Sequence, residues 1–528
     1  TGRMFLIVMQ PALTIHIVCS RKQISHRISE MKNKLYLIML LCSWQSAALA
    51  APGDNQFGRW SQVFNWPIIP IHASVLPNGK VYSWGTTQQG IQSAQFTYDI
   101  WNPAAGFGAH QLLPNTTGVD TFCSGASLMP SGNVIAAGGD TRNPINNGIH
   151  ATTVFESSTQ RLLPKPAMTF ARWYPTTITL PSGETLIHGG RDQPGQPMHT
   201  PEIFVNGTVR PLWNAANEAI TSDAEGKWYY PRDFVAPNGR VFGMSGNQMY
   251  FLDWAGNGGT QLAGNLPDKT RSHTSTAVMY RPGKIFQAGG TSYGDTQALG
   301  SQQAVSVDVT SGWPQVTPLP DMRRRRVWAN STVLPTGNVF VSGGSAYENK
   351  LIDPALMAEM WSADTHQFRD LRPAALARMY HSISLLLKDG SVLTGGGGAP
   401  GPLTNLNAEI YYPPYLFDGN GNFAPRPVLG NFNPNMGYGT VQEIPFSNAV
   451  GVSRVTFVRL GSVTHSFDTG QRFIEGGFQQ VGNRVRITFP LSRNNAPPGF
   501  YYVFIFNKLG VPSVAKIFGL EAAPVPAG

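Results

Sequence analysis

The chain has 528 residues, a formal net charge of +9, and only 13% charged residues, about half of what is usual for a soluble protein. Its 57 glycines and 41 prolines exclude a mostly helical protein because both residues break helices, and its 11% aromatic residues exclude intrinsic disorder. No apolar run reaches the ~18 residues of a membrane span. The remaining class is a large, turn-rich, all-β globular protein.

Residues 1–50 are predicted to be an upstream extension followed by a secretory signal peptide. The signal, Met31–Ala50, has a basic start with two lysines, an apolar core over residues 35–41 and the cleavage motif Ala48-Leu49-Ala50. It predicts Sec-dependent export to the extracellular space or the periplasm, with a mature chain that begins at Ala51. A short buried helix is the alternative interpretation.

Removing residues 1–50 leaves 33 Lys and Arg against 29 Asp and Glu, a net charge of +4, and leaves Cys123 as the only cysteine. This charge is too small for nucleic-acid binding, which needs a clustered basic stripe. The short run Arg323–Arg326 is expected to be a solvated approach to a strand. A single cysteine excludes a disulfide within the chain, so Cys123 is buried, paired outside the chain or chemically used.

Seven segments between residues 72 and 398 share one pattern: an apolar strand, a turn that ends in glycine, and a second apolar strand, usually followed by Gly-Gly. A period of about 50 residues is typical of kelch repeats, in which each repeat forms one four-stranded blade. We therefore predict that residues 51–415 form a seven-bladed kelch-type β-propeller. The turn glycines are Gly79, Gly132, Gly183, Gly239, Gly283, Gly337 and Gly390.

Two further segments complete the predicted architecture. Residues 59–65 align with the approach strand of a hairpin but follow no earlier blade, so we expect them to supply the missing last strand of the seventh blade and to remove its open edge. Residues 416–528 lose the repeat and show alternating strands separated by turn clusters, a pattern that predicts an immunoglobulin-like β-sandwich.

The repeat also predicts a site, because the residue nine positions before each turn glycine lies at the mouth of an innermost strand, facing the central channel. Cys123 and Tyr174 come from adjacent blades, whereas Tyr380 and His381 come from the opposite side. Consecutive strand residues point to opposite faces, so Tyr380 and His381 can share one centre only if the backbone bends there. The seven positions are Pro70, Cys123, Tyr174, Tyr230, Thr274, Trp328 and His381.

Each of these residues also has an ordinary structural interpretation. A lone buried cysteine is often a small apolar core residue, and a tyrosine at a strand end usually packs and forms hydrogen bonds. A non-catalytic propeller that binds carbohydrate or a cell-surface partner is therefore a second hypothesis. A glycosidase would need paired carboxylates around the channel, and the seven positions include none.

Four segments carry a family resemblance: DTFCSGASLMPSGNVIAAGGD, ARWYPTTITLPSGETLIHGG, ARMYHSISLLLKDGSVLTGGGG and LGSVTHSFDTGQR. They resemble the galactose oxidase and glyoxal oxidase family of copper-radical oxidases, over nearly all of residues 57–525. The resemblance implies an enzyme with one copper ion that oxidises a primary alcohol, a small aldehyde or a carbohydrate with O2 and releases H2O2. We expect the secreted chain to be a monomer.

The resemblance also implies roles for individual residues. Cys123 would be joined through a thioether to Tyr174, which would be a copper ligand and the radical carrier. Tyr380 would be the axial ligand and the base for the substrate hydroxyl, while His381 and His465 would be imidazole ligands. Imidazole and phenolate donors suit Cu(II). The radical would supply the second oxidising equivalent, because copper cycling between Cu(II) and Cu(I) supplies only one.

One position departs from the family pattern. In galactose oxidase a tryptophan after the blade-three glycines shields the radical tyrosine, whereas here Arg191 and Asp192 follow those glycines. The shield is then missing or comes from elsewhere. Trp328 either shields the radical tyrosine or only fills the channel. Tyr230, Trp328 and Arg191 are expected to line the substrate pocket. The departure favours a substrate other than galactose.

Overall fold

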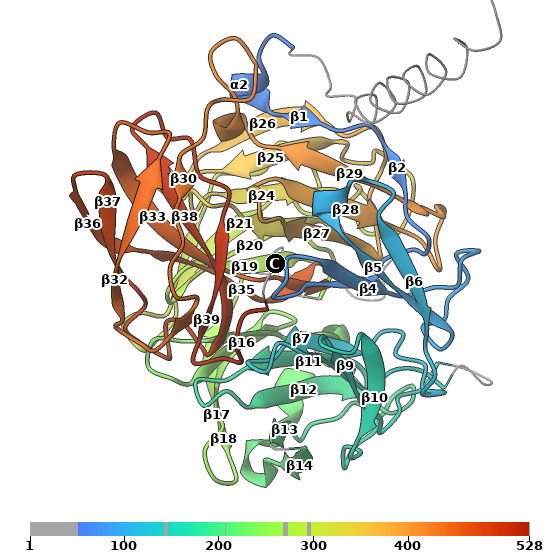
Figure 1. Ribbon diagram of the computed structural model, residues 1–528. Helices are drawn as coiled ribbons and strands as arrows, with labels where there is room; N and C mark the ends of the chain where they lie inside the picture. The colour runs from blue at the N-terminus through green and yellow to red at the C-terminus, as the bar shows by residue number, and fades with distance from the viewer. Residues whose placement is uncertain (1–50, 142–145, 206, 268–272, 293–296, 527–528) are drawn as a thin grey trace, which may run out of the picture. The chain divides into compact units, whose positions relative to one another are not determined.

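The computed structural model describes residues 51–141, 146–205, 207–267, 273–292 and 297–526, so the predicted signal peptide lies outside the described residues. Residues Ala50–Gly528 form one compact unit. Within the described residues the structure is almost entirely β, and its α-helices are the short α2 (Asp54–Phe57) and α3 (Glu218–Thr221) (Figure 1). No helix among these residues is long and apolar enough to cross a membrane.

All seven predicted hairpins form, and further antiparallel strands extend each of them into a group of four or more, which we number repeats 1 to 7. Repeats 1 to 3 are β3 (His72–Val75) to β6 (His110–Pro114), β7 (Gly125–Leu128) to β10 (Arg161–Lys165), and β11 (Trp173–Thr179) to β14 (Thr208–Pro211). Repeats 4 to 6 are β15 (Arg232–Val235) to β18 (Gly259–Asn265), β19 (Thr276–Arg281) to β22 (Gln315–Pro318), and β23 (Asn330–Val333) to β26 (Phe368–Pro373). Repeat 7 contains β27 (Ser382–Leu386), β28 (Val392–Gly396) and β29 (Asn407–Tyr412).

The hairpin turns use glycine for its backbone freedom. Every predicted turn glycine has a positive φ, for example 81° at Gly132 and 90° at Gly183. L-residues with a Cβ rarely adopt this left-handed conformation. A Cβ on Gly132 would also lie 3.2 Å from Cγ of Pro77. The turn chemistry therefore explains why the repeat is visible in the sequence.

Repeat 7 is completed from the amino end of the described chain, as predicted. The strands β1 (Arg59–Trp60) and β2 (Phe64–Asn65) both pair antiparallel with β29, in the registers Arg59↔Tyr412 and Phe64↔Ala408. The free edge of β29 is thereby covered, which protects it from pairing with another chain.

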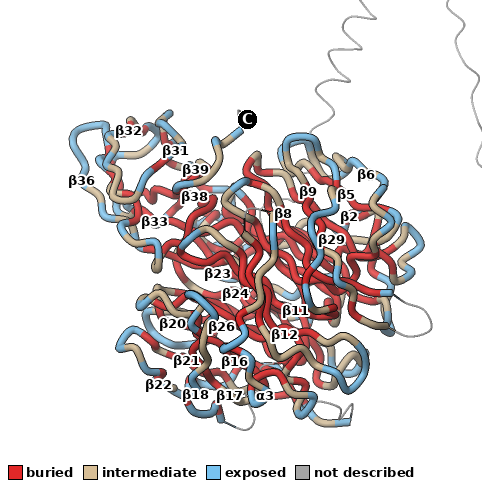
Figure 2. The backbone as a smooth tube through the Cα atoms, turned by 90° about the horizontal axis from the view of Figure 1, so that it is seen from below, coloured by how far each residue is buried: buried red, intermediate tan, exposed pale blue. Residues whose placement is uncertain are grey.

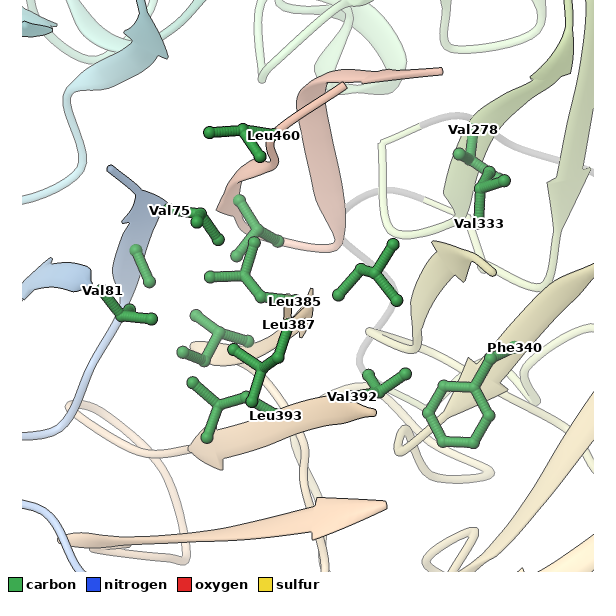
Figure 3. Close-up of a cluster of buried hydrophobic side chains, with 14 of the residues drawn as sticks. Val75, Val81, Val278, Val333, Phe340, Leu385, Leu387, Val392, Leu393 and Leu460 are labelled. Carbon is green, nitrogen blue, oxygen red and sulfur yellow. The ribbon is translucent and has the colours of Figure 1, made fainter. Parts of the chain in front are cut away.

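The innermost strands are buried along their length because other strands pack against both of their faces (Figure 2). Figure 3 shows part of the resulting core, in which side chains of repeats 1, 5, 6 and 7 lie together with Leu460 from the carboxyl-terminal region. Burying a large aliphatic side chain contributes about 1.5–3 kcal/mol. The core is thus shared between repeats rather than confined to each one.

Buried ion pairs fix the chain just before three of the innermost strands. Arg172 pairs with Glu202 at 2.9 Å, Arg326 with Glu359 at 2.9 Å, and Arg378 with Glu409 at 3.2 Å. Each arginine also donates to the carbonyl of a glycine at the end of the second strand of its repeat. The prediction of a solvated run at residues 323–326 is therefore wrong at Arg326, which is buried, while Arg323 and Arg324 are exposed.

The carboxyl-terminal region has its own apolar core and two sheets. One sheet contains β30 (Val428–Leu429), β32 (Val441–Ser447), β36 (Gly477–Val481) and β37 (Arg484–Thr488). The other strands are β31 (Asn435–Met436), β33 (Val452–Arg459), β38 (Gly499–Asn507) and β39 (Lys516–Leu520). The three strands expected from alternation correspond to β33, β37 and β38, whereas the boundary at residue 415 stays a prediction.

A hairpin from this region enters the middle of the repeats. It consists of β34 (Ser462–Thr464) and β35 (Phe467–Glu475); β34 pairs with β3 of repeat 1, and β35 runs parallel to β19 of repeat 5. The two strands contact the first strand of every repeat, namely β3, β7, β11, β15, β19, β23 and β27. The hairpin therefore occupies the centre around which the first strands are arranged.

Candidate metal centre

The backbone at the mouths of the innermost strands is left-handed. Five of the seven predicted positions have a positive φ: 56° at Cys123, 63° at Tyr174, 40° at Tyr230, 63° at Trp328 and 65° at His381. Such residues each cost about 1–3 kcal/mol and cluster at functional sites. Consecutive residues such as Tyr380 and His381 can share one centre only if the backbone bends, and the positive φ of His381 supplies that bend.

Main-chain hydrogen bonds connect these positions from one repeat to the next. The Tyr174 N–H donates to the Cys123 carbonyl at 2.9 Å, and the Tyr230 N–H donates to the Tyr174 carbonyl at 3.0 Å. The Trp328 N–H donates to the Thr274 carbonyl at 3.0 Å in the same way. Neighbouring repeats thus hold each other in register where the predicted site residues lie.

The phenol groups of Tyr174 and Tyr380 meet although 206 residues separate them. Their hydroxyl oxygens are 2.6 Å apart, and the hydroxyl of Tyr229 lies 2.9 Å from that of Tyr380. The ring of Tyr380 stacks on His381 with 3.7 Å between the ring centroids. Three hydroxyls and one imidazole therefore converge where β27 begins.

Two imidazoles present their Nε2 atoms to the same place. Cys123 Sγ lies 4.0 Å from Nε2 of His381 and 3.7 Å from Nε2 of His465. Nδ1 of His381 is held by the Gly398 carbonyl at 2.7 Å, and Nδ1 of His465 by the Thr464 hydroxyl at 2.6 Å. With Nδ1 engaged in each ring, Nε2 is left as the atom available to a metal.

His465 reaches this place because it lies in the turn of the β34–β35 hairpin. His465 and Ser466 both have positive φ, 45° and 66°, so the turn is tight. The buried carboxylate of Asp468 accepts N–H groups from Ser462 at 2.9 Å and Gln471 at 3.2 Å, which stabilises the turn. Burial raises the pKa of Asp468 to about 6. The sequence THSFDTGQ therefore forms a turn that holds the His465 imidazole in a fixed position.

Burial keeps the site residues uncharged. It raises the pKa of Cys123, Tyr174, Tyr229 and Tyr380 above the ordinary values of thiols and phenols. It also lowers the pKa values of the histidines, to about 3 for His381. The site therefore offers neutral imidazoles and protonated phenols, and a phenol would become a phenolate only by losing its proton to a bound cation.

Aromatic rings surround the Tyr174 side chain. The centroids of Trp173 and Tyr229 lie 4.1 and 4.2 Å from that of Tyr174. Trp328, predicted as shield or filler, packs instead against Tyr380 at 4.7 Å and Tyr229 at 5.7 Å. The rings closest to Tyr174 are thus supplied by Trp173 and Tyr229.

The residues expected to line a pocket occupy different surroundings. Tyr230 is buried, donates to the Ser124 carbonyl at 2.9 Å and stacks on His465 at 4.7 Å, and Trp328 is also buried. Arg191 is half-buried, with its guanidinium 4.8 Å from the Trp173 ring and 4.4 Å from the Trp228 ring. Tyr230 and Trp328 are thus packed among buried rings, and Arg191 lies over two of the tryptophans, whereas a role of these three residues in lining a substrate pocket stays a prediction.

Tyr229, Trp173 and His72 are the site neighbours that sequence reasoning missed. Tyr229 and Trp173 each precede a mouth position by one residue, as Tyr380 does. Examining the residue before each mouth position, and not only the one before His381, could therefore have identified Tyr229 and Trp173. His72 lies two residues after the mouth position of repeat 1, and its contact with Cys123 has no sequence signal of its own.

Comparison with known proteins agrees with this arrangement. Residues 99–415 match the family model for the glyoxal oxidase N-terminus, and residues 426–519 match the galactose oxidase-like early set domain. The chain belongs to the glyoxal oxidase family of copper-radical oxidases. The resemblance inferred from the four sequence segments is thereby confirmed.

Individual relatives cover most of the chain. A galactose oxidase of Gibberella zeae is 29% identical over 501 residues, which cover 90% of this chain and 72% of that protein. The aldehyde oxidase GLOX of Vitis pseudoreticulata is 29% identical over 535 residues, which cover 89% of this chain and 98% of that protein. A copper complex of a fungal alcohol oxidase of the AA5 family matches the fold with a TM-score of 0.78 at 25% identity, and covers 88% of this chain and all of that one.

The donor set of the described residues fits copper. The ligand atoms of Cys123, His381 and His465 lie within 4.8 Å of one another. The paired hydroxyls belong to Tyr174 and Tyr380, whose rings pack against His465 and His381. Nitrogen and oxygen donors of this kind are those that Cu(II) prefers. The second bond made by each Nδ1 orients its ring, as is usual for metal-binding histidines.

Proposed function

We propose that the chain is a secreted mononuclear copper-radical oxidase that oxidises a primary alcohol or a small aldehyde with O2, giving an aldehyde or an acid and H2O2. The observation that carries this proposal is the 2.6 Å approach of the Tyr174 and Tyr380 hydroxyls beside the Nε2 atoms of His381 and His465. Relatives named aldehyde oxidase, galactose oxidase and alcohol oxidase support the reaction class.

Tyr174, Tyr380, His381 and His465 would hold the copper. When bound, copper would supply one oxidising equivalent and stabilise phenolate oxygen, which burial otherwise disfavours at both tyrosines. His381 and His465 are already neutral and oriented, so only the phenols must release protons. Copper affinity should consequently rise with pH.

Removing two electrons from a substrate requires a second acceptor, and the Tyr174 ring is the candidate. We propose that a thioether between Cys123 and a carbon beside the Tyr174 hydroxyl makes this ring easier to oxidise. Forming the bond removes one hydrogen from the thiol and one from the ring. The two electrons and two protons reduce O2 to H2O2 in the presence of copper, so the reaction balances.

Proton transfer falls to Tyr380. Its oxygen lies 2.6 Å from the Tyr174 oxygen and 2.9 Å from the Tyr229 oxygen. As a phenolate, after releasing its own proton to solvent, Tyr380 would take the proton of a substrate hydroxyl and keep it, while the Tyr229 hydroxyl donates a hydrogen bond to its oxygen. A general base of this kind contributes about 10²–10⁴-fold to a rate. Trp173 and Tyr229 cover the Tyr174 ring and would protect it from side reactions.

The proposal also includes a closed propeller as the scaffold and secretion of the chain. We infer that the seven repeats are the blades of one closed propeller, because the β34–β35 hairpin contacts the first strand of each repeat and β1 and β2 complete repeat 7. Secretion is supported by the signal-like pattern of Met31–Ala50. A non-catalytic binding propeller is the competing function.

The test is copper content together with a peroxide-release screen over small aldehydes, primary alcohols and sugars. We expect one copper per chain and H2O2 release with at least one substrate class, and loss of both in His465→Ala while circular dichroism shows a folded protein. A folded chain that binds no copper and consumes no O2 with any substrate would favour the binding module.

A further inference from the structure

His72 is a buried histidine that the proposed chemistry does not use. It begins β3, has no exposed surface, and stacks on Trp84 with 4.8 Å between centroids and only 5° between ring planes. The indole N–H of Trp84 donates to the Thr121 carbonyl at 3.3 Å. The His72 ring therefore packs against Trp84, which is itself bonded to Thr121, two residues before Cys123.

The decisive contact is between the Cys123 N–H and Nε2 of His72, at 3.1 Å. At Tyr174, Tyr230 and Trp328 the corresponding N–H donates to a main-chain carbonyl at the mouth position of the preceding repeat. At Cys123 a side chain replaces that carbonyl as the acceptor. Among the four mouth positions whose N–H has an acceptor in the described structure, Cys123 is the one whose acceptor is a side chain.

This contact fixes the form of the imidazole. Because Nε2 accepts a hydrogen bond, it carries no proton, and the proton of the neutral ring is on Nδ1. Nδ1 of His72 has no hydrogen-bond partner among the described residues and is buried. Leaving such a group unpaired lowers the stability of the fold, a loss that an apolar ring would avoid. A filler role therefore does not explain a histidine here.

His72 also connects Cys123 to the metal ligands. Residue 72 pairs with Thr464 in the β3–β34 ladder, directly before His465, and the rings of His72 and His465 lie 5.7 Å apart. On its other side Cys123 accepts the Tyr174 N–H through its carbonyl. Cys123 is consequently held from both neighbouring repeats in a left-handed conformation with φ 56°.

We propose that His72 is a positioning residue for formation of the Cys123–Tyr174 thioether, holding the cysteine main chain so that the thiol meets the tyrosine ring. This proposal rests on the proposed function, because it presupposes that the thioether forms. Positioning of reacting atoms is sensitive to distance, and a displacement of about 1 Å costs about 10²-fold in rate. An unheld Cys123 should therefore link slowly even where copper still binds.

The experiment follows the link itself rather than turnover. Copper-free full-length protein is mixed with Cu(II) in air, and the linked peptide pair, short by two hydrogens, is measured over time by mass spectrometry. We compare wild type, His72→Leu and His72→Gln. His188→Gln is the matched control, because His188 is an equally buried histidine that bonds Asp233 at 2.9 Å and has no contact with Cys123.

We expect the Leu variant to bind one copper and to link at least tenfold more slowly than wild type. The Gln variant should recover part of the rate, because its carbonyl can accept the Cys123 N–H, and His188→Gln should link at the wild-type rate. If the Leu variant does not fold, His72→Phe, which keeps a ring against Trp84 but offers the Cys123 N–H no acceptor, takes its place, and linking at the rate of His188→Gln would overturn the proposal.

Two other outcomes are distinguishable. Linking of folded His72→Leu at the wild-type rate would overturn the role of His72 and leave the oxidase proposal intact. Absence of the link in copper-loaded wild type would instead contradict the proposed function, and the positioning role with it.

Discussion

The two ends of the seven hairpins use the same backbone conformation for different purposes. At the turn end the left-handed residue is glycine, as at Gly132 and Gly183, and the conformation costs little. At the mouth end it is Cys123, Tyr174 or His381, for which the same conformation is strained. The glycines at the turn end stabilise the hairpins. The strained residues at the mouth end lower the stability of the fold, but they orient their side chains towards one centre.

This difference predicts that substitutions at the two ends have opposite consequences. Substitution of a left-handed residue at the mouth end should alter chemistry with modest effects on stability, and substitution of a turn glycine should alter stability without affecting chemistry.

The largest effect on activity is expected from Tyr174→Phe, which keeps the ring but removes the hydroxyl 2.6 Å from Tyr380. Peroxide release should fall to background while the melting temperature changes by only a few degrees. The control is Tyr411→Phe, which removes a buried hydroxyl that donates to the Phe57 carbonyl at 2.8 Å, far from the mouth end. It should lose about 1 kcal/mol of stability and keep full activity.

A large effect on stability is expected from Arg172→Leu, which leaves the carboxylate of Glu202 buried without its partner. Breaking such a pair costs about 3–5 kcal/mol, measurable by urea unfolding. The double variant with Glu202→Leu should recover part of this loss, because no buried charge remains. A single variant as stable as wild type would contradict a supporting role for the ion pair before Tyr174.

A smaller effect is expected at the turn end from Gly132→Ala. The left-handed φ of 81° and the 3.2 Å approach of a Cβ to Pro77 should lower the free energy of unfolding by about 1–2 kcal/mol. The kcat and the copper content should remain those of wild type. Loss of activity in a variant that stays folded would show that the two ends are not independent.

A graded effect is expected from the pH dependence of stability in the copper-free protein. Burial lowers the pKa values of His72, His381 and His465 in the folded state, whereas unfolded histidine titrates near 6.5. The unfolded chain therefore takes up more protons below pH 6.5, and stability should fall as the pH drops from about 6.5 towards 3, by at most about 1.4 kcal/mol per pH unit for each histidine. Melting temperatures across this range should fall less steeply in His381→Gln, and an identical profile would contradict this assignment.

The sequence predicted the elements that follow from local chemistry. The turn glycines located the seven hairpins, the register placed Cys123 beside Tyr174, and the unpaired segment at residues 59–65 identified the strands that complete repeat 7. These features depend on glycine conformation and strand period, which a sequence records directly.

Side-chain contacts between repeats were harder to predict. The positions of Tyr229 against Tyr380 and of His72 against Cys123 depend on how far the left-handed residues turn the chain, and no local pattern encodes that angle. Arg326 was misread for a similar reason, since its partner Glu359 lies 33 residues away on a strand that the arginine run does not reveal.

The most direct test of the central claim is a crystal structure of the copper-loaded protein with anomalous diffraction recorded at the copper edge. We expect a single strong peak within bonding distance of Nε2 of both His381 and His465 and of the Tyr174 and Tyr380 oxygens. A copper peak elsewhere in a folded, fully loaded protein, or none at these four residues, would contradict the account.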